Sequence, residues 1–207
     1  MSEPDDPRET IVVTGLPRAG TSLVMQVLEA GGVPLLADRA RPADAHNPRG
    51  YFEYAPARAV LRDTAWLEAA RGRAVKLVAP LVTALPGDRS YRVLFVERRL
   101  DEVVASQRAM LAAEAARRVA ANEPADELLA SLRADPSALA AAYARALEQT
   151  RAALEARRAC RVLRLEHAAL LAAPRREAAR IAEFLDRALD LEAMAAAVLP
   201  VLWRQRS

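Results

Sequence analysis

The residues whose types and spacing most clearly suggest chemistry lie in the segment TIVVTGLPRAGTSL, residues 10–23. A β-branched run leads into a turn bounded by two glycines, and a helical pattern follows. Glycine lets the backbone bend tightly and approach an anion closely. The free N–H groups at a helix start, with their partial positive charge, favour such an anion. Arg18 and the hydroxyls of Thr21 and Ser22 add donors, so the segment predicts a phosphate-binding loop.

The loop has the spacing of a Walker A motif, G-x-x-x-x-G-K-[ST], but Thr21 stands where the lysine belongs. That lysine reaches the β- and γ-phosphates of a nucleoside triphosphate, so its absence counts against a kinase or an ATPase. No predicted strand ends in the aspartate that helps to hold Mg²⁺, and Glu97 and Glu166 are weak substitutes. We therefore expect no metal. The alternative is a strand-to-helix turn that binds nothing.

The loop resembles that of sulfotransferases that use 3′-phosphoadenosine 5′-phosphosulfate (PAPS), which is typically Pro-[Lys/Arg]-Ser-Gly-Thr-Thr after the first strand. The matching residues here are Pro17, Arg18, Ala19, Gly20, Thr21 and Ser22. The resemblance implies that they grip the 5′-phosphosulfate of the donor, with adenosine 3′,5′-bisphosphate (PAP) as the product. It also implies that Arg18 neutralises charge on the bridging oxygen as the S–O bond breaks.

A second match is the segment FVERRLDEVVAS, residues 95–106. Members of this family carry an arginine at the end of a strand and a serine eight positions later, and the two bind the 3′-phosphate of PAPS. Arg98 and Ser106 have that separation. An arginine at the carboxyl end of a strand and a serine near the start of the next helix can meet over the sheet edge, and a guanidinium suits phosphate. The alternative is a solvent-facing arginine and an ordinary helical serine.

The segment VKLVAP, residues 75–80, resembles the family segment Val-Lys-Thr-His-x-Pro. Lys76 is the only lysine of the chain, and an ammonium group within an apolar strand is costly to bury without a partner. The resemblance implies that Lys76 reaches the sulfuryl group. Alternatively, its side chain extends past the sheet edge into solvent. Many relatives use the histidine of this segment to take the proton of the acceptor, and here Val78 replaces it.

Because Val78 cannot accept a proton, another residue must serve as the general base for the acceptor. His46 lies in a polar loop, and we expect a structural role for His167 at a helix start. The segment NPRGYFE, residues 47–53, resembles a glycine-aromatic-aromatic-glutamate passage of bacterial relatives. Glu53 beside aromatic residues is thus the candidate base. A surface carboxylate, or a salt bridge to an arginine, is the alternative.

Short apolar runs alternate with helical patterns along the chain. Four runs predict strands, and a fifth predicts a short edge strand: residues 10–14, 74–79, 92–97, 160–165 and 32–36. Helices are predicted after Thr21, Asp101 (as an N-cap), Ser137, Pro174 and Asp190. This alternation predicts a P-loop-type three-layer α/β/α sandwich around a mainly parallel sheet of four or five strands. Residues 162–174 and 180–185 resemble a strand and helices of the same family and support that fold.

The 207 residues predict one sulfotransferase-like domain, residues 1–207, with residues 1–9 disordered and residues 112–158 as a helical cover over the acceptor side. The net charge of +3 is compatible with an anionic ligand, and nothing indicates nucleic acid. No apolar stretch approaches the ~20 residues of a membrane span. The polar, acidic first residues do not resemble a secretory signal, and one cysteine, Cys160, cannot form an intrachain disulfide. We expect a cytoplasmic protein.

These patterns together predict transfer of a sulfuryl group from PAPS to a hydroxyl or amine. The acceptor class is a small molecule, a carbohydrate or a lipid, and the sequence names neither the acceptor nor the oligomeric state. Two alternatives stay open. One is a P-loop kinase of small molecules, and the other is a homologue that binds the donor but has no activity.

Overall fold

The computed structural model describes residues 9–38, 50–158 and 160–198, and its centre is a four-stranded sheet. The strands are β1 (Thr10–Gly15), β2 (Ala74–Lys76), β3 (Tyr91–Glu97) and β4 (Cys160–Glu166), in the order β2-β1-β3-β4. All three pairings are parallel. Val13 lies beside Lys76, Gly15 beside Val96, and Glu97 beside Glu166, so the carboxyl ends of the strands share one edge.

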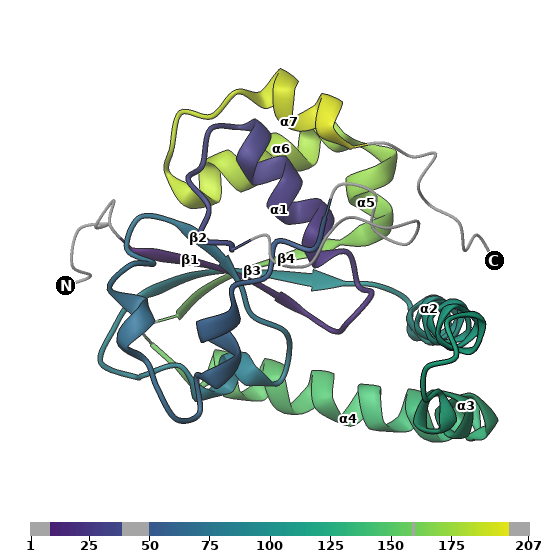
Figure 1. Cartoon of the computed structure of the whole chain (residues 1–207). Coiled ribbons are helices and arrows are strands. Elements are labelled where there is room, and N and C mark those ends of the chain that lie inside the picture. Colours follow the sequence, from purple (N-terminus) through teal and green to yellow (C-terminus); the bar gives the residue numbers. More distant parts are fainter. Residues whose placement is uncertain (1–8, 39–49, 159, 199–207) are drawn as a thin grey trace.

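Helices cover both faces of this sheet, which confirms the predicted three-layer α/β/α architecture (Figure 1). One face carries α1 (Thr21–Ala30), α5 (His167–Ala172), α6 (Pro174–Leu185) and α7 (Leu191–Ala197). The other face carries α4 (Pro136–Glu155) and the 3-10 turns η1 (Ala55–Ala59), η2 (Ala65–Leu67) and η3 (Leu81–Ala84). The core is accordingly divided in two, because successive strand residues point to opposite faces.

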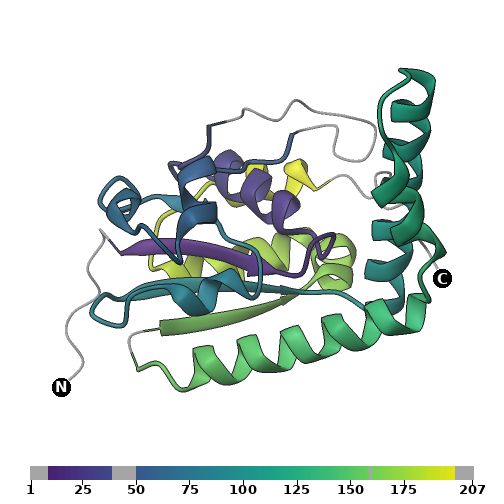
Figure 2. The same cartoon turned by 60° about the horizontal axis from the view of Figure 1, so that its bottom comes forward.

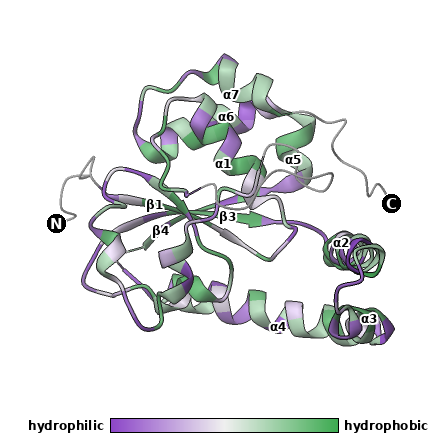
Figure 3. Ribbon diagram, viewed as in Figure 1, coloured by the Kyte–Doolittle hydropathy of each residue, from purple (hydrophilic) through white to green (hydrophobic). Residues whose placement is uncertain are grey.

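The alternation is visible in β1. Ile11 and Val13 pack with Val24 and Leu28 of α1, whereas Val12 packs with Trp66 and other residues of the opposite face. All six residues of β1 are buried, as expected for a central parallel strand covered on both sides. Figure 3 shows the hydrophobic residues along the strands that fill these two core layers.

The helices α2 (Leu100–Ala120) and α3 (Asp126–Arg133) stand side by side at the carboxyl end of the sheet (Figures 1 and 2). α2 ends before Pro124, and α3 ends before Pro136. Pro136 occupies the first turn of α4, where its missing N–H costs nothing, and the Asp135 side chain accepts a hydrogen bond from the Ser137 N–H at 2.9 Å. The covering role predicted for residues 112–158 stays a prediction.

Three local predictions were wrong. The edge strand predicted at 32–36 is reduced to a single bridge between Leu35 and Ala74, because the N–H groups of Gly32 and Val33 bond to carbonyls of α1 and Pro34 has no N–H. Asp101 is not the N-cap of its helix: α2 begins at Leu100 after Arg99, and Asp101 pairs instead with that arginine at 2.6 Å. Glu9, predicted to be disordered, accepts a hydrogen bond from Arg92 Nε at 2.8 Å; residues 1–8 lie outside the described residues.

The strand order places a topological switch point between β1 and β3. The chain leaves β1, forms α1 on one face and returns as β2 on one side of β1, whereas β3 lies on the other side. The connections after β1 and β3 therefore diverge, and open α/β sheets bind ligands in the crevice outside such a point. Within the described residues, no helix combines the length and apolar character needed to cross a membrane.

Candidate functional site

The loop between β1 and α1 is a tight turn with an unusual backbone. The Ala19 N–H donates to the Leu16 carbonyl at 3.1 Å, which makes Pro17 and Arg18 the two central residues of the turn. Arg18 has φ of 69°, the left-handed value that a type II turn requires after its proline and that glycine usually supplies. Such a conformation costs of order 1–3 kcal/mol, so surrounding contacts must hold Arg18 in place.

Gly20 ends the loop and caps α1. Its φ is 107°, and no side chain caps the helix there. The Val24 N–H donates to the Gly20 carbonyl at 3.2 Å, which is the first bond of the helix. The preceding N–H groups are the unsatisfied donors of a helix start and face the loop. Left-handed and right-handed residues in succession turn neighbouring N–H groups toward one concavity, which favours anions.

The contacts on one side of the loop form what we call the β3 flank: Arg18, Arg98, Glu102, Ser106 and His167. Arg18 Nε donates to Ser106 Oγ at 3.1 Å, across 88 positions of the sequence. Arg98 Nη1 donates to the Arg18 carbonyl at 3.2 Å. Arg98 and Ser106 thus both contact Arg18, the first at its backbone carbonyl and the second at its guanidinium. Their proposed contact with a 3′-phosphate stays a prediction.

Arg98 is held by a buried ion pair. Its Nε lies 2.7 Å from Glu102 Oε2, and both side chains are 8% exposed. Buried charges must be paired and hydrogen-bonded. Two of the Arg98 nitrogens, Nε and Nη1, donate to Glu102 and to the Arg18 carbonyl. The third, Nη2, is buried and has no acceptor among the described residues. Arg98 therefore has one donor left for an incoming anion.

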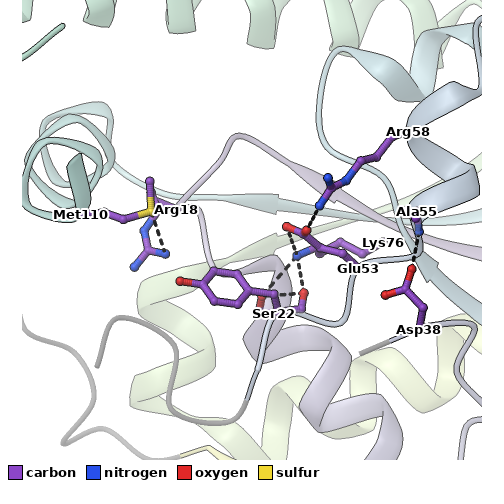
Figure 4. A network of polar contacts seen from close by, with 9 residues as sticks. Arg18, Ser22, Asp38, Glu53, Ala55, Arg58, Lys76 and Met110 are labelled. Carbon is purple, nitrogen blue, oxygen red and sulfur yellow. Dashed lines mark hydrogen bonds and ion pairs between the residues drawn. The ribbon is translucent and has the colours of Figure 1, made fainter. Parts of the chain in front are cut away.

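The contacts on the other side form the β2 flank: Ser22, Tyr51, Glu53, Arg58 and Lys76 (Figure 4). The Lys76 side chain is 6% exposed, and its ammonium group donates to the Tyr51 carbonyl and to Ser22 Oγ, the latter at 3.5 Å. Lys76 Nζ lies 6.0 Å from the centroid of the Tyr51 ring. The ammonium group is turned inward to the first turn of α1, so the alternative of a lysine extended into solvent is wrong.

Glu53 lies between two cations. Its Oε1 is 3.7 Å from Lys76 Nζ, and its Oε2 forms an ion pair with Arg58. The carboxylate is 24% exposed, whereas Arg58 is 66% exposed. The salt bridge that the sequence left as an alternative is therefore present. Glu53 nevertheless stands beside Lys76, next to the helix start. Figure 4 shows Arg18 on the far side of Ser22 from this group.

His167 lies against Gly20, the last residue of the loop. It begins α5 directly after β4 and is buried, with 8% of its surface exposed. A Cβ placed on Gly20 would meet His167 Cδ2 at 2.6 Å. Burial, together with the nearby charge of Arg98, lowers the pKa of His167 to about 4 against an opposing effect of Glu102. The imidazole is therefore neutral at physiological pH. His46, the other histidine, lies outside the described residues.

The sequence did not single out Glu102, the Tyr51 carbonyl or Met110, whose sulfur lies 4.0 Å from Arg18 Nη1. Glu102 could have been found, because it follows Arg98 by four positions and such pairs face each other on one side of a helix start. No sequence signal marks a backbone carbonyl as a partner of Lys76. Within residues 9–38, 50–158 and 160–198, no group of three or more histidine, cysteine or acidic side chains could hold a metal ion.

Comparisons with known proteins add little to this geometry. No family model matches the sequence, and no curated protein does. Among solved structures, the chain is similar to an unliganded sugar kinase from Janibacter sp. HTCC2649, with a TM-score of 0.38 and 13% identity over 95% of this chain and 98% of that one. A likeness at this level carries no argument about fold or activity. The fold is therefore assigned from the sheet order and layers described above.

Proposed function

We propose that the protein is a PAPS-dependent sulfotransferase. The observation that carries the proposal is the contact chain from Arg98 through the Arg18 carbonyl to Ser106. It joins a phosphate-type loop to an arginine and a serine at the spacing of a 3′-phosphate site. A donor with phosphate groups at both ends of its ribose matches two cationic elements at one sheet edge better than a nucleoside triphosphate does.

In this proposal the loop N–H groups and Ser22 hold the 5′-phosphosulfate, and Arg98 with Ser106 holds the 3′-phosphate. Arg98 Nη2 is buried and has no acceptor among the described residues, and in this proposal it donates to a phosphate oxygen. Lys76 approaches the same helix start from β2, through Ser22 Oγ. Arg18 and Lys76 then place positive charge near the oxygen that gains charge as the donor breaks.

The transfer itself requires position and charge more than covalent help. An acceptor hydroxyl attacks sulfur, the bond from sulfur to the bridging oxygen breaks, and PAP leaves with that electron pair. The acceptor proton passes to a base, for which we propose Glu53. Its carboxylate stands 3.7 Å from Lys76 Nζ, on the side where an acceptor must enter if Lys76 addresses the sulfuryl group. To accept a proton it must loosen its ion pairs with Arg58 and Lys76.

The proposal is tested by incubating the protein with PAPS and panels of phenols, alcohols, sugars and amines, and measuring PAP release. Release that depends on both protein and acceptor supports a sulfotransferase. If PAP binds but no acceptor panel gives turnover, a donor-binding protein without activity becomes the better description. Phosphoryl transfer from ATP–Mg²⁺ to any panel member would instead establish the kinase alternative.

A further inference from the structure

The contact between Gly20 and His167 suggests how the phosphate loop is held in shape. Gly20 is the last residue of the loop, and its position sets where the first N–H groups of α1 point. The imidazole lies so close that a Cβ at Gly20 would meet Cδ2 at 2.6 Å and Nε2 at 3.5 Å. Because His167 is buried and begins α5, the ring has little room to move away.

The buried pair of Arg98 and Glu102 lies near His167. Arg98 and Glu102 form their buried pair close enough to influence the imidazole, and Arg98 also holds the Arg18 carbonyl at 3.2 Å. The loop is thus contacted at two points, at Arg18 by a hydrogen bond from Arg98 and at Gly20 by van der Waals contact with His167. A neutral imidazole is suited to the second point, since it fills space without adding a charge that must be solvated.

We propose that His167 is a positioning residue that fixes Gly20, and with it the helix-start N–H groups, in the arrangement that binds an anion. This inference rests on the proposed function only for the identity of the anion. It gives position 20 a second requirement for glycine besides its φ of 107°.

The test is a double-mutant cycle of Gly20→Ala and His167→Ala, read as the affinity for PAP and for inorganic pyrophosphate, with unfolding measured in parallel. Strain from a Cβ at positive φ is the same in both backgrounds and cancels in the cycle. Gly32 is the matched control, because its φ is 90° and a Cβ there would meet nothing within 4 Å. Gly32→Ala should therefore combine additively with His167→Ala.

We expect His167→Ala to weaken both anions by about tenfold, which corresponds to the loss of about one hydrogen bond from a misplaced loop N–H group. Gly20→Ala should cost less affinity in the His167→Ala background than in the wild type. His167→Asn, which keeps atoms near the Cδ2 position, should retain most of the affinity. Unchanged anion affinity in His167→Ala, or an additive cycle at Gly20, would overturn the inference even if unfolding becomes easier.

The two probes separate this inference from the proposed function. If the wild type binds pyrophosphate but not PAP, the sulfotransferase proposal fails, while the cycle read with pyrophosphate still decides the role of His167. If PAP binds and His167→Ala leaves its affinity unchanged, the positioning role fails alone. A wild type that binds neither anion would overturn both. If His167→Ala does not fold, His167→Ser takes its place in the cycle, because serine also removes the ring atoms beside Gly20 and should weaken both anions in the same way.

Discussion

The two flanks of the loop differ in how firmly they hold their charges. In the β3 flank the Arg98 and Glu102 side chains are each 8% exposed and lie 2.7 Å apart. In the β2 flank Glu53 is 24% exposed, and its partner Arg58 is 66% exposed. Breaking a buried pair is costly, whereas an exposed pair contributes about 0–1 kcal/mol. The buried pair of the β3 flank is therefore fixed, whereas the pair of Glu53 and Arg58 in the β2 flank can rearrange.

Under the proposed function, this difference matches the two tasks of a group-transfer site. The donor is the same molecule in every turnover, so a fixed site suits it. The side chains of such a site are already ordered by folding, which lowers the entropic cost of binding. An acceptor enters and leaves beside a base that must change its partners, so an exchangeable ion pair suits it. The contrast predicts that substitution of Arg98 affects donor affinity, whereas substitution of Glu53 affects turnover.

The largest expected effect is on turnover in Glu53→Gln. This change keeps the shape of the side chain and removes its basicity, and general-base assistance contributes about 10²–10⁴-fold in rate. Steady-state turnover with an identified acceptor should fall by that factor, with PAP affinity nearly unchanged. Glu68→Gln is the matched control, since Glu68 also pairs with an arginine, Arg89, but is 60% exposed. Wild-type turnover in Glu53→Gln would exclude it as the base, and lost PAP binding would show a structural role.

The next effect concerns the pH dependence of stability. The pKa of His167 is about 4 in the folded protein, and the usual value is 6.5. Between these values the unfolded chain binds a proton that the folded chain does not, so stability falls as the pH decreases from 6.5 toward 4. A shift of this size corresponds to at most ~3 kcal/mol. Denaturant unfolding of His167→Asn should show a flatter profile over this interval, and an identical profile would contradict the buried neutral state.

A smaller effect is expected on donor affinity in Arg98→Ala. Loss of a charge-assisted contact worth roughly 1.5–3 kcal/mol should weaken PAP binding about ten- to a hundredfold, measured by titration calorimetry. Adenosine 5′-phosphosulfate, which has no 3′-phosphate, should lose less affinity. Arg99→Ala is the matched control, because its neighbouring guanidinium is 68% exposed and pairs with Asp101. Equal weakening of the two nucleotides would mean that Arg98 acts only through the Arg18 carbonyl.

The smallest effect separates the backbone of Arg18 from its side chain. Arg18→Gly and Arg18→Ala both remove the guanidinium, so both should weaken PAP equally. At φ of 69° an alanine keeps the left-handed penalty and a glycine does not. We therefore expect Arg18→Gly to be more stable to denaturant than Arg18→Ala by about 1 kcal/mol. Equal stability of the two variants would show that the turn relaxes once the side chain is removed.

The layers of the fold were predictable because the two central strands, β1 and β3, are largely apolar and are separated by helical patterns. Thr10–Gly15 reads as a buried strand from composition alone, and Gly20 marks the start of the helix. The edge strand at 32–36 was over-predicted, because a run of apolar residues does not show whether its backbone finds a partner. The prediction of Asp101 as the N-cap was wrong for a related reason. Arg99, which lies two residues before Asp101, pairs with its carboxylate.

The site was less predictable than the fold. The register of parallel strands brings Lys76, the loop and Arg98 to one edge, and that much follows from the pattern. The pattern does not tell which of the two arginines contacts Ser106. Arg18 and Arg98 have side chains of the same length, and only the geometry of the turn selects Arg18. The contact between Gly20 and His167 depends on where β4 ends relative to β1, two strands away, which no local pattern encodes.

The central claim is that the loop and the β3 flank bind an adenosine 3′,5′-bisphosphate rather than a nucleoside triphosphate. Thermal unfolding with PAP, ADP and ATP–Mg²⁺ tests it directly, and ADP is the matched ligand because it carries two phosphates at one end. A ligand at ~100 times its dissociation constant adds about 2.7 kcal/mol of stability, which a melting experiment detects. The account predicts that PAP raises the melting temperature more than ADP or ATP–Mg²⁺ at equal concentration. Equal or greater stabilisation by ATP–Mg²⁺ would contradict it.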